Sequence, residues 1–208
     1  MYLSRVEINT ENRQIMRELN NVGAYHNWVE RSFPEEIENG IRTRKLWRVD
    51  KLGDKKYLLL LSESKPNIEL LEQYGVKQTG ATKNYINFIN QLKTGDKLKF
   101  RLVANPTISK FEGSKVRGKV VPCNSEESQI QYLLKKSVHH GFSLLENEFY
   151  ILENSSETYK KGKVELKKVT YEGYLTIENI DIFRETLLRG IGRKKAYGFG
   201  MLTVLPNK

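Results

Sequence analysis

The order of strand-like and helix-like segments constrains the fold of this chain more than any other feature of its sequence. Apolar residues at alternate positions indicate strands, and apolar residues three or four apart indicate helices. In the first half these segments are, in order, YLSRVEI (2–8), ENRQIMRELNN (11–21), TRKLWRVD (43–50), KKYLLLLSE (55–63), TKNYINFINQL (82–92) and KLKFRLVANP (97–106). Their order, β-α-β-β-α-β, is that of a ferredoxin-like or RRM-like unit.

The second half repeats this order less regularly. Its segments are the strand SKVRGKVVP (114–122), the helix SEESQIQYLLKKSVHH (125–140), the strand FYILE (149–153), a hairpin of YKKGKVELKK (159–168) with VTYEGYLTI (169–177), the helix NIDIFRETLLR (179–189) and the strand FGMLTVL (199–205). We predict an α+β protein of two tandem ferredoxin-like domains, residues 1–108 and 109–208. The domains are expected to pack against each other because no long linker separates them.

The chain is basic, with 35 Lys and Arg residues against 25 Asp and Glu residues and a net charge of +10. This excess favours a polyanionic partner such as a nucleic acid, although a merely Lys-rich protein has the same composition. No apolar run approaches the ~18 residues of a membrane span, and MYLSRVEINTENRQ lacks the apolar core of a signal peptide. The single cysteine, Cys123, excludes an intrachain disulfide, so we expect a cytoplasmic protein without a membrane partner.

Four glycines surround three consecutive cations in RGIGRKKAYGFG (189–200). The segment does not match the dinucleotide-binding pattern G-x-G-x-x-G, because Lys195 stands where the third glycine should be. It also runs from a predicted helix to a predicted strand, which is the reverse of that motif. The P-loop pattern G-x-x-x-x-G-K-[ST] does not occur in the sequence. Both nucleotide-binding motifs are therefore excluded.

Part of this segment has a structural explanation. One of its first two glycines is expected to cap the preceding helix, and its last two are expected to allow close packing. The three cations are not explained in that way, and cations between flexible backbone N–H groups suit the binding of phosphates. The predicted phosphate-binding residues are Gly190, Gly192, Arg193, Lys194 and Lys195.

Several short segments follow one another over nearly the whole chain. They are MYLSRVEI at the start, His26 with Phe33–Pro34 after it, LWRVD (46–50), FRLVANP (100–106), YEGYLTIEN (171–179) and GIGRKKAYGFGML (190–202). In this order they resemble the CasE family, the repeat endoribonucleases of type I-E CRISPR systems. The resemblance implies cleavage of CRISPR precursor RNA at the base of a repeat stem-loop, without a metal ion or other cofactor. The ribose 2′-OH would attack the adjacent phosphate and leave a 2′,3′-cyclic phosphate and a 5′-OH. It also implies that the enzyme stays on the mature crRNA and joins the other Cascade subunits.

Such cleavage needs a proton acceptor and a proton donor, and histidine serves as either near neutral pH. Of the three histidines, His139 and His140 end a predicted helix, where a cation stabilises the helix dipole, and they lack the companions of a metal site. The resemblance places the catalytic histidine at His26. The family often has a tyrosine three residues earlier, where this chain has Gly23. Tyr25 is therefore the candidate partner, although on a helix it would point about 100° away from its neighbour.

The segment YKKGKVELKK carries five lysines and one glutamate. Such a ribbon can hold an RNA hairpin through its phosphates, and family members use a basic hairpin in this region. The alternative is that the lysines protect an exposed strand edge from aggregation. The candidate RNA-binding residues of this segment are Lys160, Lys161, Lys163, Lys167 and Lys168. Another cationic run, Arg42 to Arg48, would be divided between two faces of a strand, and we assign it no role.

Two other functions fit the same fold and charge. A non-catalytic scaffold subunit of a CRISPR ribonucleoprotein would bind guide RNA without cutting it. An RNA-modification or ribosome-associated factor would have no preference for a repeat hairpin. Cleavage of a repeat RNA separates the nuclease from both.

Overall fold

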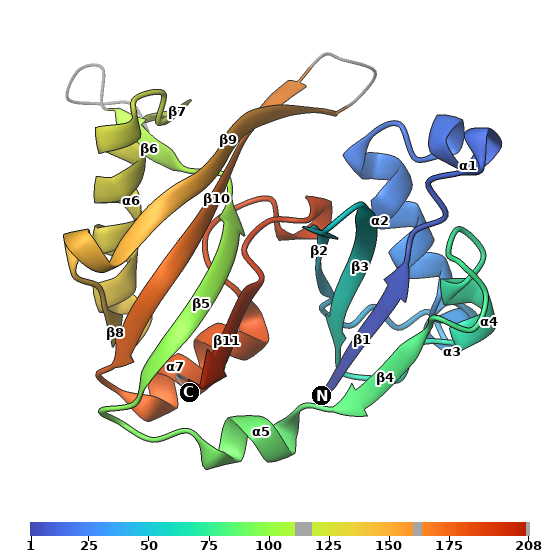
Figure 1. Cartoon of the computed structure of the whole chain (residues 1–208), viewed down its shortest axis with the longest axis horizontal. Coiled ribbons are helices and arrows are strands. Elements are labelled where there is room, and N and C mark those ends of the chain that lie inside the picture. Colours follow the sequence, from blue (N-terminus) through green and yellow to red (C-terminus); the bar gives the residue numbers. More distant parts are fainter. Residues whose placement is uncertain (111–117, 160–163, 207–208) are drawn as a thin grey trace.

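The structure is a computed structural model that describes residues 1–110, 118–159 and 164–206. Two antiparallel sheets stand side by side, and the long β9–β10 hairpin extends from the second sheet across the top of the molecule (Figure 1). None of the helices in these three described ranges is long and apolar enough to cross a membrane.

The first sheet has the strand order β2-β3-β1-β4, which is the ferredoxin-like order. Its strands are β1 (Tyr2–Glu7), β2 (Leu46–Leu52), β3 (Lys55–Ser62) and β4 (Ala81–Asn84), and its helices are α1 (Arg13–Glu18), α2 (Val22–Arg31), α3 (Pro34–Glu38) and α4 (Ile68–Leu71). The apolar face of α2, with Trp28 and Val29, packs against Val6 of β1 and Leu58 and Leu60 of β3. This packing fixes α2, which carries His26, against the sheet.

The fourth strand of this sheet differs from the prediction. We expected a helix over 82–92, but Ala81–Asn84 pairs with β1 and only Ile86–Gln91 is helical (α5). The side-chain hydroxyls of Ser4 and Thr82 are hydrogen-bonded at 2.8 Å across the pair. The strand is short and almost wholly exposed, so it has no apolar alternation by which the sequence could reveal it.

The second sheet has the order β11-β5-β10, and both β8 and β9 pair with β10. Its elements are β5 (Lys97–Ala104), α6 (Glu126–His139), β8 (Phe142–Ser143), the 3-10 helix η1 (Glu146–Glu148), β9 (Phe149–Tyr159), β10 (Val164–Ile177), α7 (Ile180–Arg189), the 3-10 helix η2 (Lys195–Tyr197) and β11 (Leu202–Pro206). Leu133 of α6 and Phe183 and Leu187 of α7 share one core with the strands. The chain therefore forms two tandem ferredoxin-like domains, as predicted.

The expectation that residues 97–106 close the first domain is wrong. Strand β5 pairs with β10 and β11, because its buried residues Leu98, Phe100 and Leu102 belong to the second core. The segment at 114–122, expected to open the second domain, instead contributes β7 (Lys119–Pro122) to a two-stranded sheet with β6 (Thr107–Lys110). We therefore propose a domain boundary between α5 and β5 in place of 108/109.

The predicted hairpin between residues 159–168 and 169–177 is also wrong. Residues Val164–Ile177 form one continuous strand, β10, and its partner along most of that length is β9. Apolar positions of both predicted strands are buried along this one strand, with Leu166 in a small cluster beside Val103 and Phe199, and Val169 and Tyr171 in the main core of the second sheet. The described residues of the basic segment therefore belong to the β9–β10 hairpin, Tyr159 to β9 and residues 164–168 to β10.

Arg48 of β2 ties the two sheets together. Its side chain is buried, and its Nη1 donates to the backbone carbonyls of Arg101 in β5 (3.0 Å) and Met201 (3.1 Å). Its Nη2 donates to Asp50 at 2.9 Å and to the Thr203 hydroxyl of β11 at 2.7 Å. A guanidinium can serve all these acceptors because it presents five donors in one plane. Arg48 is therefore a structural cation.

Candidate active site

Helix α2 holds His26 in a partly buried position. The helix begins at its N-cap, Asn21, whose side chain accepts hydrogen bonds from the backbone N–H groups of Gly23 (2.9 Å) and Ala24 (3.2 Å). One turn further on, the His26 side chain is 17% exposed. This leaves the imidazole in contact with solvent on one side only.

The neighbours of His26 favour its neutral form and fix its tautomer. Nε2 lies 3.0 Å from Nη2 of Arg42, and a guanidinium can only donate, so Nε2 is the acceptor and the ring proton is on Nδ1. Nδ1 faces Oε1 of Glu30 at 3.8 Å. Burial lowers the pKa of His26; Glu30 opposes this shift, and Arg42 and Lys45 add to it. The result is an unprotonated Nε2 that can act as a base at neutral pH.

A buried ion pair between Lys45 and Glu36 lies next to Glu30. The Lys45 ammonium is almost fully buried, 2.7 Å from Glu36 and 3.5 Å from Glu30. Burial by itself would raise the pKa of Glu36, but hydrogen bonds from Lys45, Ser64 and Thr43 outweigh it and lower that pKa to about 2. Lys45 therefore holds the Glu30 carboxylate in place beside the imidazole.

The glycine-rich segment comes next to His26. The ring of Tyr197, at the end of η2, meets the His26 ring at an interplanar angle of 61°, with centroids 5.7 Å apart. The indole N–H of Trp47 holds η2 by donating to the carbonyl of Ala196 at 3.1 Å. The backbone of Gly198 lies so close to Trp47 that a Cβ there would be 2.7 Å from the indole ring. The expectation of close packing at Gly198 is confirmed, and this packing places Tyr197 in the site.

Tyr197 also joins the site to the β9–β10 hairpin. Its hydroxyl donates to that of Tyr159 at 2.5 Å, and the two ring centroids are 4.3 Å apart. This bond raises the pKa of Tyr197, burial adds to the shift, and Arg42 opposes it. Tyr159 lies over Gly23, where an added Cβ would be 3.7 Å from its ring. Sequence reasoning missed both tyrosines, and the only signal was an aromatic residue inside each basic segment.

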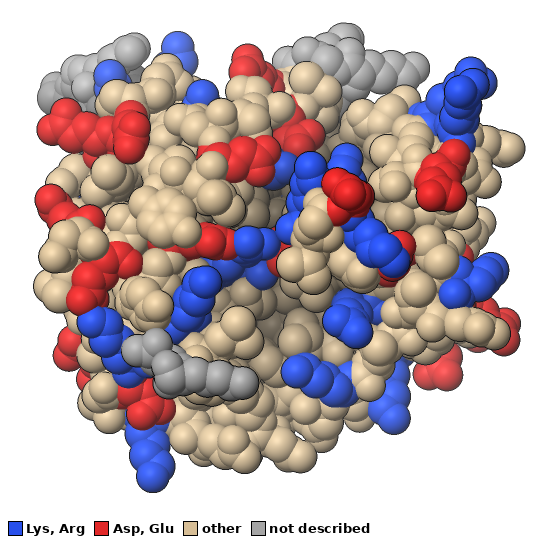
Figure 2. All heavy atoms as spheres, viewed as in Figure 1, with Lys and Arg blue, Asp and Glu red and all other residues tan. Residues whose placement is uncertain are grey.

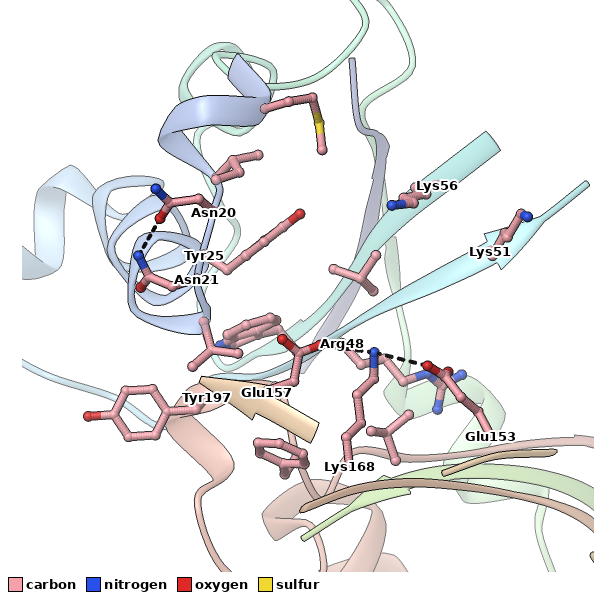
Figure 3. Close-up of a pocket in the computed structure, with 18 residues that line it drawn as sticks. Asn20, Asn21, Tyr25, Arg48, Lys51, Lys56, Glu153, Glu157, Lys168 and Tyr197 are labelled. Carbon is pink, nitrogen blue, oxygen red and sulfur yellow. Dashed lines mark hydrogen bonds and ion pairs between the residues drawn. The ribbon is translucent and has the colours of Figure 1, made fainter. Parts of the chain in front are cut away.

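Tyr25 turns away from His26. Its ring stacks on Trp47, with centroids 5.7 Å apart and an interplanar angle of 20°, and it lines a cleft between the two domains (Figure 3). Burial raises the pKa of Tyr25, and the charge of Glu157 adds to this rise. The structure thus brings Tyr197, rather than Tyr25, into ring contact with the histidine. A part for Tyr25 in the chemistry stays a prediction.

The cations of the glycine-rich segment lie at the surface beside this site. Arg193 and Lys194 are exposed, and the Lys194 ammonium lies 5.9 Å from the centre of the Tyr197 ring. Lys195 is half-buried; its pKa is lowered by burial and by the charges of Arg44, Lys136 and Arg189. We call Lys195, Arg44, Lys136 and Arg189 the cation cluster. Its members come from the segment before β2, from α6, from the end of α7 and from η2, so the sequence could not reveal it.

The two glycines predicted to bind phosphate have structural roles. Gly190 ends α7, and its backbone N–H donates to the carbonyl of Thr186 at 2.8 Å. Gly192 faces Tyr132, since an added Cβ would be 2.4 Å from the tyrosine hydroxyl. Both have φ values in the left-handed region, +70° and +80°, which favours glycine. The predicted helix cap is confirmed at Gly190, and phosphate binding by either glycine stays a prediction.

The basic ribbon is described only in part. Lys160, Lys161 and Lys163 lie outside the described residues. Lys167 and Lys168 are half-buried on β10, and the Lys168 ammonium is 3.2 Å from Glu157 and 3.8 Å from Glu153 of β9. Lys168 is therefore partly neutralised within the hairpin.

The other two histidines lie apart from His26, at the end of α6. His140 caps the helix, and its Nδ1 is 3.0 Å from the Thr186 hydroxyl, which itself donates to the His140 carbonyl at 3.1 Å. Burial, followed by the charges of Lys136, Lys195 and His139, lowers the pKa of His140 to about 4. His140 is therefore neutral at pH 7, so the expected cation at the helix dipole is wrong for this residue. Within the described ranges, no three His, Cys, Asp or Glu residues are grouped as metal ligands.

Comparison with known proteins gives a consistent result over the whole chain. CRISPR-associated endoribonuclease Cse3 of Thermus thermophilus is 28% identical over 220 residues, which cover 99% of this chain and all of that protein. The structure of Thermus thermophilus Cse3 bound to an RNA representing a pre-cleavage complex has a TM-score of 0.81 and 27% identity, covering 99% of this chain and 98% of the other. The CRISPR-associated protein Cas6e of Escherichia coli K-12 has a TM-score of 0.69 and 27% identity, with both chains fully covered.

The family model described as CRISPR associated protein matches residues 1–206. The resemblance seen in the sequence is confirmed, and this chain belongs to that family of CRISPR associated proteins.

Proposed function

We propose that this protein is an endoribonuclease that cuts CRISPR precursor RNA at the base of its repeat stem-loop. The observation that carries the proposal is the geometry of His26, whose Nε2 is an unprotonated acceptor at a partly open face of the protein. A base of this kind can take the proton of a ribose 2′-OH. Similarity to an endoribonuclease over 99% of the chain supports the same activity.

In the proposed reaction, Nε2 of His26 removes the 2′-OH proton as that oxygen attacks the neighbouring phosphorus. The P–O5′ bond breaks, the leaving 5′-oxygen takes up a proton from water, and the His26 imidazolium returns its proton to the solvent. The products are a 2′,3′-cyclic phosphate and a 5′-OH. Arg42 must release Nε2 for this to happen, and its side chain is free to move because it is 68% exposed. The released guanidinium can then pair with the phosphate, whose negative charge grows during the attack.

RNA binding is proposed to use the cations around this site. Arg193 and Lys194 are exposed, and the cation cluster holds Lys195 among three like charges, an arrangement that a phosphate would stabilise. Lys160, Lys161, Lys163, Lys167 and Lys168 would contact the RNA stem. The proposal includes retention of the mature crRNA and association with other Cascade subunits.

Incubation with end-labelled repeat RNA in EDTA tests this function. The expected result is one site-specific cut at the base of the stem, with a 2′,3′-cyclic phosphate on the upstream fragment. Treatment of that fragment with acid should open the cyclic phosphate to a monophosphate. Intact RNA in a gel-shifted complex would instead support the scaffold subunit, and cleavage that stops in EDTA would contradict the metal-independent mechanism.

A further inference from the structure

We propose that the cleft between the domains, next to His26, binds one unpaired nucleotide of the RNA, with its base stacked on Tyr25. This inference rests on the proposed RNA substrate. The cleft has a volume of about 450 Å³, which is within the range of small-ligand pockets. It is lined by α2 and β2 of the first domain and by β9, β10 and η2 of the second.

One wall of the cleft is aromatic. Figure 3 shows the Tyr25 side chain reaching into the open space between α2 and the β2–β3 strands. Trp47 supports this ring from behind by stacking at an interplanar angle of 20°. A rigid aromatic ring that is half-exposed beside a basic surface is the usual platform for an unpaired base in RNA-binding proteins.

The lining of the cleft includes two cations that have no carboxylate partner in the described part of the chain. Lys51 and Lys56 are direct cross-strand partners in the β2–β3 hairpin, and both are exposed. Like charges placed opposite each other destabilise a sheet. Among the described residues, no carboxylate lies within 4.0 Å of either ammonium, whereas the neighbouring Lys55 is paired with Glu7 at 2.9 Å. A phosphate bound between Lys51 and Lys56 would relieve this repulsion.

The opposite wall offers hydrogen-bond partners for the edge of a base. Glu153 and Glu157 of β9 both face the cleft, and their side chains are 52% and 36% exposed. Lys168 lies between them and provides donors. Carboxylates accept hydrogen bonds from the exocyclic amino groups of bases, which sugars and phosphates do not have. Figure 2 shows Lys and Arg side chains on both sides of the central hollow, with carboxylates between them.

The cleft and the catalytic site share one residue. Tyr197 lines the cleft and meets the His26 ring. A nucleotide stacked on Tyr25 would therefore be followed by one whose ribose reaches His26. The bound base would act as an anchor that sets which phosphate is cut.

Binding of two RNAs that differ only in their unpaired nucleotides tests this inference. One is the repeat stem-loop with its single-stranded flanks and the other is the blunt stem-loop, both with 2′-deoxy substitutions across the base of the stem to prevent cleavage. For the flanked RNA we expect Tyr25→Ala to raise Kd about 10-fold, as for the loss of one stacked base. Tyr25→Phe should bind as the wild type does, since it keeps the ring. The Kd for the blunt RNA should be unchanged in both variants.

A charge variant keeps the test independent of any loss of stability at Tyr25. Lys51→Glu/Lys56→Glu changes two exposed residues and should weaken only the flanked RNA, whereas the matched control Lys83→Glu, on exposed β4, should not. Equal weakening of both RNAs, or none with Tyr25→Ala, would overturn the nucleotide site. The assay measures binding and does not depend on cleavage. Absence of cleavage by the wild type would therefore contradict the proposed function but would leave the test of the nucleotide site valid. Loss of activity in Tyr25→Phe would indicate chemistry by the hydroxyl instead of stacking.

Discussion

The Tyr197 ring lies against the His26 imidazole, with the ring centroids 5.7 Å apart, although the two residues come from opposite ends of the chain. This contact joins the glycine-rich segment to the candidate base. It predicts that Tyr197 positions His26 and keeps water away from one side of its ring.

The variant Tyr197→Ala tests this positioning role. We expect cleavage under saturating protein to slow by about 10- to 100-fold, with little change in Kd for RNA, because a misplaced base loses its alignment with the ribose. Exposure of the imidazole to water should also raise the pKa seen in the pH–rate profile toward 6.5, which a merely structural residue would not change. Tyr197→Phe keeps the ring, so its cleavage rate and its pKa should both lie closer to the wild-type values than those of Tyr197→Ala do. An unaltered rate and pKa in Tyr197→Ala would contradict the role.

The pH dependence of cleavage follows from the lowered pKa of His26. A general base acts in its neutral form, so the rate should rise with pH through a midpoint below 6.5 and be level at neutral pH. Arg42→Gln should move this midpoint upward, because Arg42 disfavours the imidazolium. Glu30→Gln should move it downward, because Glu30 favours it. Shifts of the same sign in the two variants would contradict the electrostatic description of the site.

The ion pair between Lys45 and Glu36 should stabilise the protein at pH values above the ordinary pKa of a glutamate. The pKa of Glu36 is lowered from 4.5 to about 2, so this stabilisation is complete above pH ~4.5 and is lost as the pH falls toward 2. By urea unfolding, Glu36→Gln should lower the free energy of unfolding at pH 7 by about 3 kcal/mol. The difference from the wild type should shrink below pH 4.5. Glu38→Gln, on the same helix but exposed, should have little effect at either pH.

Arg48 lies in strand β2, and Arg44 lies just before it. Variants of these two arginines should separate an effect on stability from an effect on RNA binding. Arg48→Ala removes the hydrogen bonds to the second sheet and leaves Asp50 with less counter-charge, so it should cost about 3–5 kcal/mol of unfolding free energy. Arg44→Ala changes an exposed member of the cation cluster. It should leave stability within about 0.5 kcal/mol of the wild type. A wild-type unfolding curve for Arg48→Ala would contradict its role as a link between the domains.

The salt dependence of RNA binding tests whether Arg44 contacts the RNA. Each phosphate contact contributes to the slope of log K against log[salt], so Arg44→Ala should weaken binding and reduce the slope by about 1. The matched control is Arg13→Ala, an exposed arginine on α1 away from the cation cluster. The same slope for Arg44→Ala as for the wild type would remove Arg44 from the RNA surface.

The sequence was enough to predict the fold class, because both domains keep the strand and helix periods of a β-α-β-β-α-β unit. It did not assign the strands correctly, since β4 is short and exposed and β5 is as apolar as a closing strand of either domain would be. Which core receives Leu98, Phe100 and Leu102 depends on contacts with α6 and α7, which periodicity does not record. For this reason we propose the domain boundary between α5 and β5 in place of 108/109.

The candidate site was predictable only where chemistry depends on one residue type. Metal-free cleavage favours a histidine, which limited the choice to three residues, and the family resemblance placed the catalytic one at His26. Tyr197 and Arg42 contact His26 through tertiary packing, and Tyr159 bonds to Tyr197; nothing in their spacing along the chain indicates these contacts. Tyr25, adjacent to His26 in sequence, faces the cleft instead because neighbours on a helix point about 100° apart.

Single-turnover cleavage of repeat RNA by His26→Ala tests the central claim most directly. His139→Ala is the matched control, since this histidine is exposed at the end of α6. We predict that His26→Ala lowers the cleavage rate by at least about 10²- to 10⁴-fold, with a Kd for RNA close to that of the wild type. His139→Ala should cut the RNA at the wild-type rate. Cleavage by His26→Ala at the wild-type rate and position would contradict the assignment of His26 as the catalytic base.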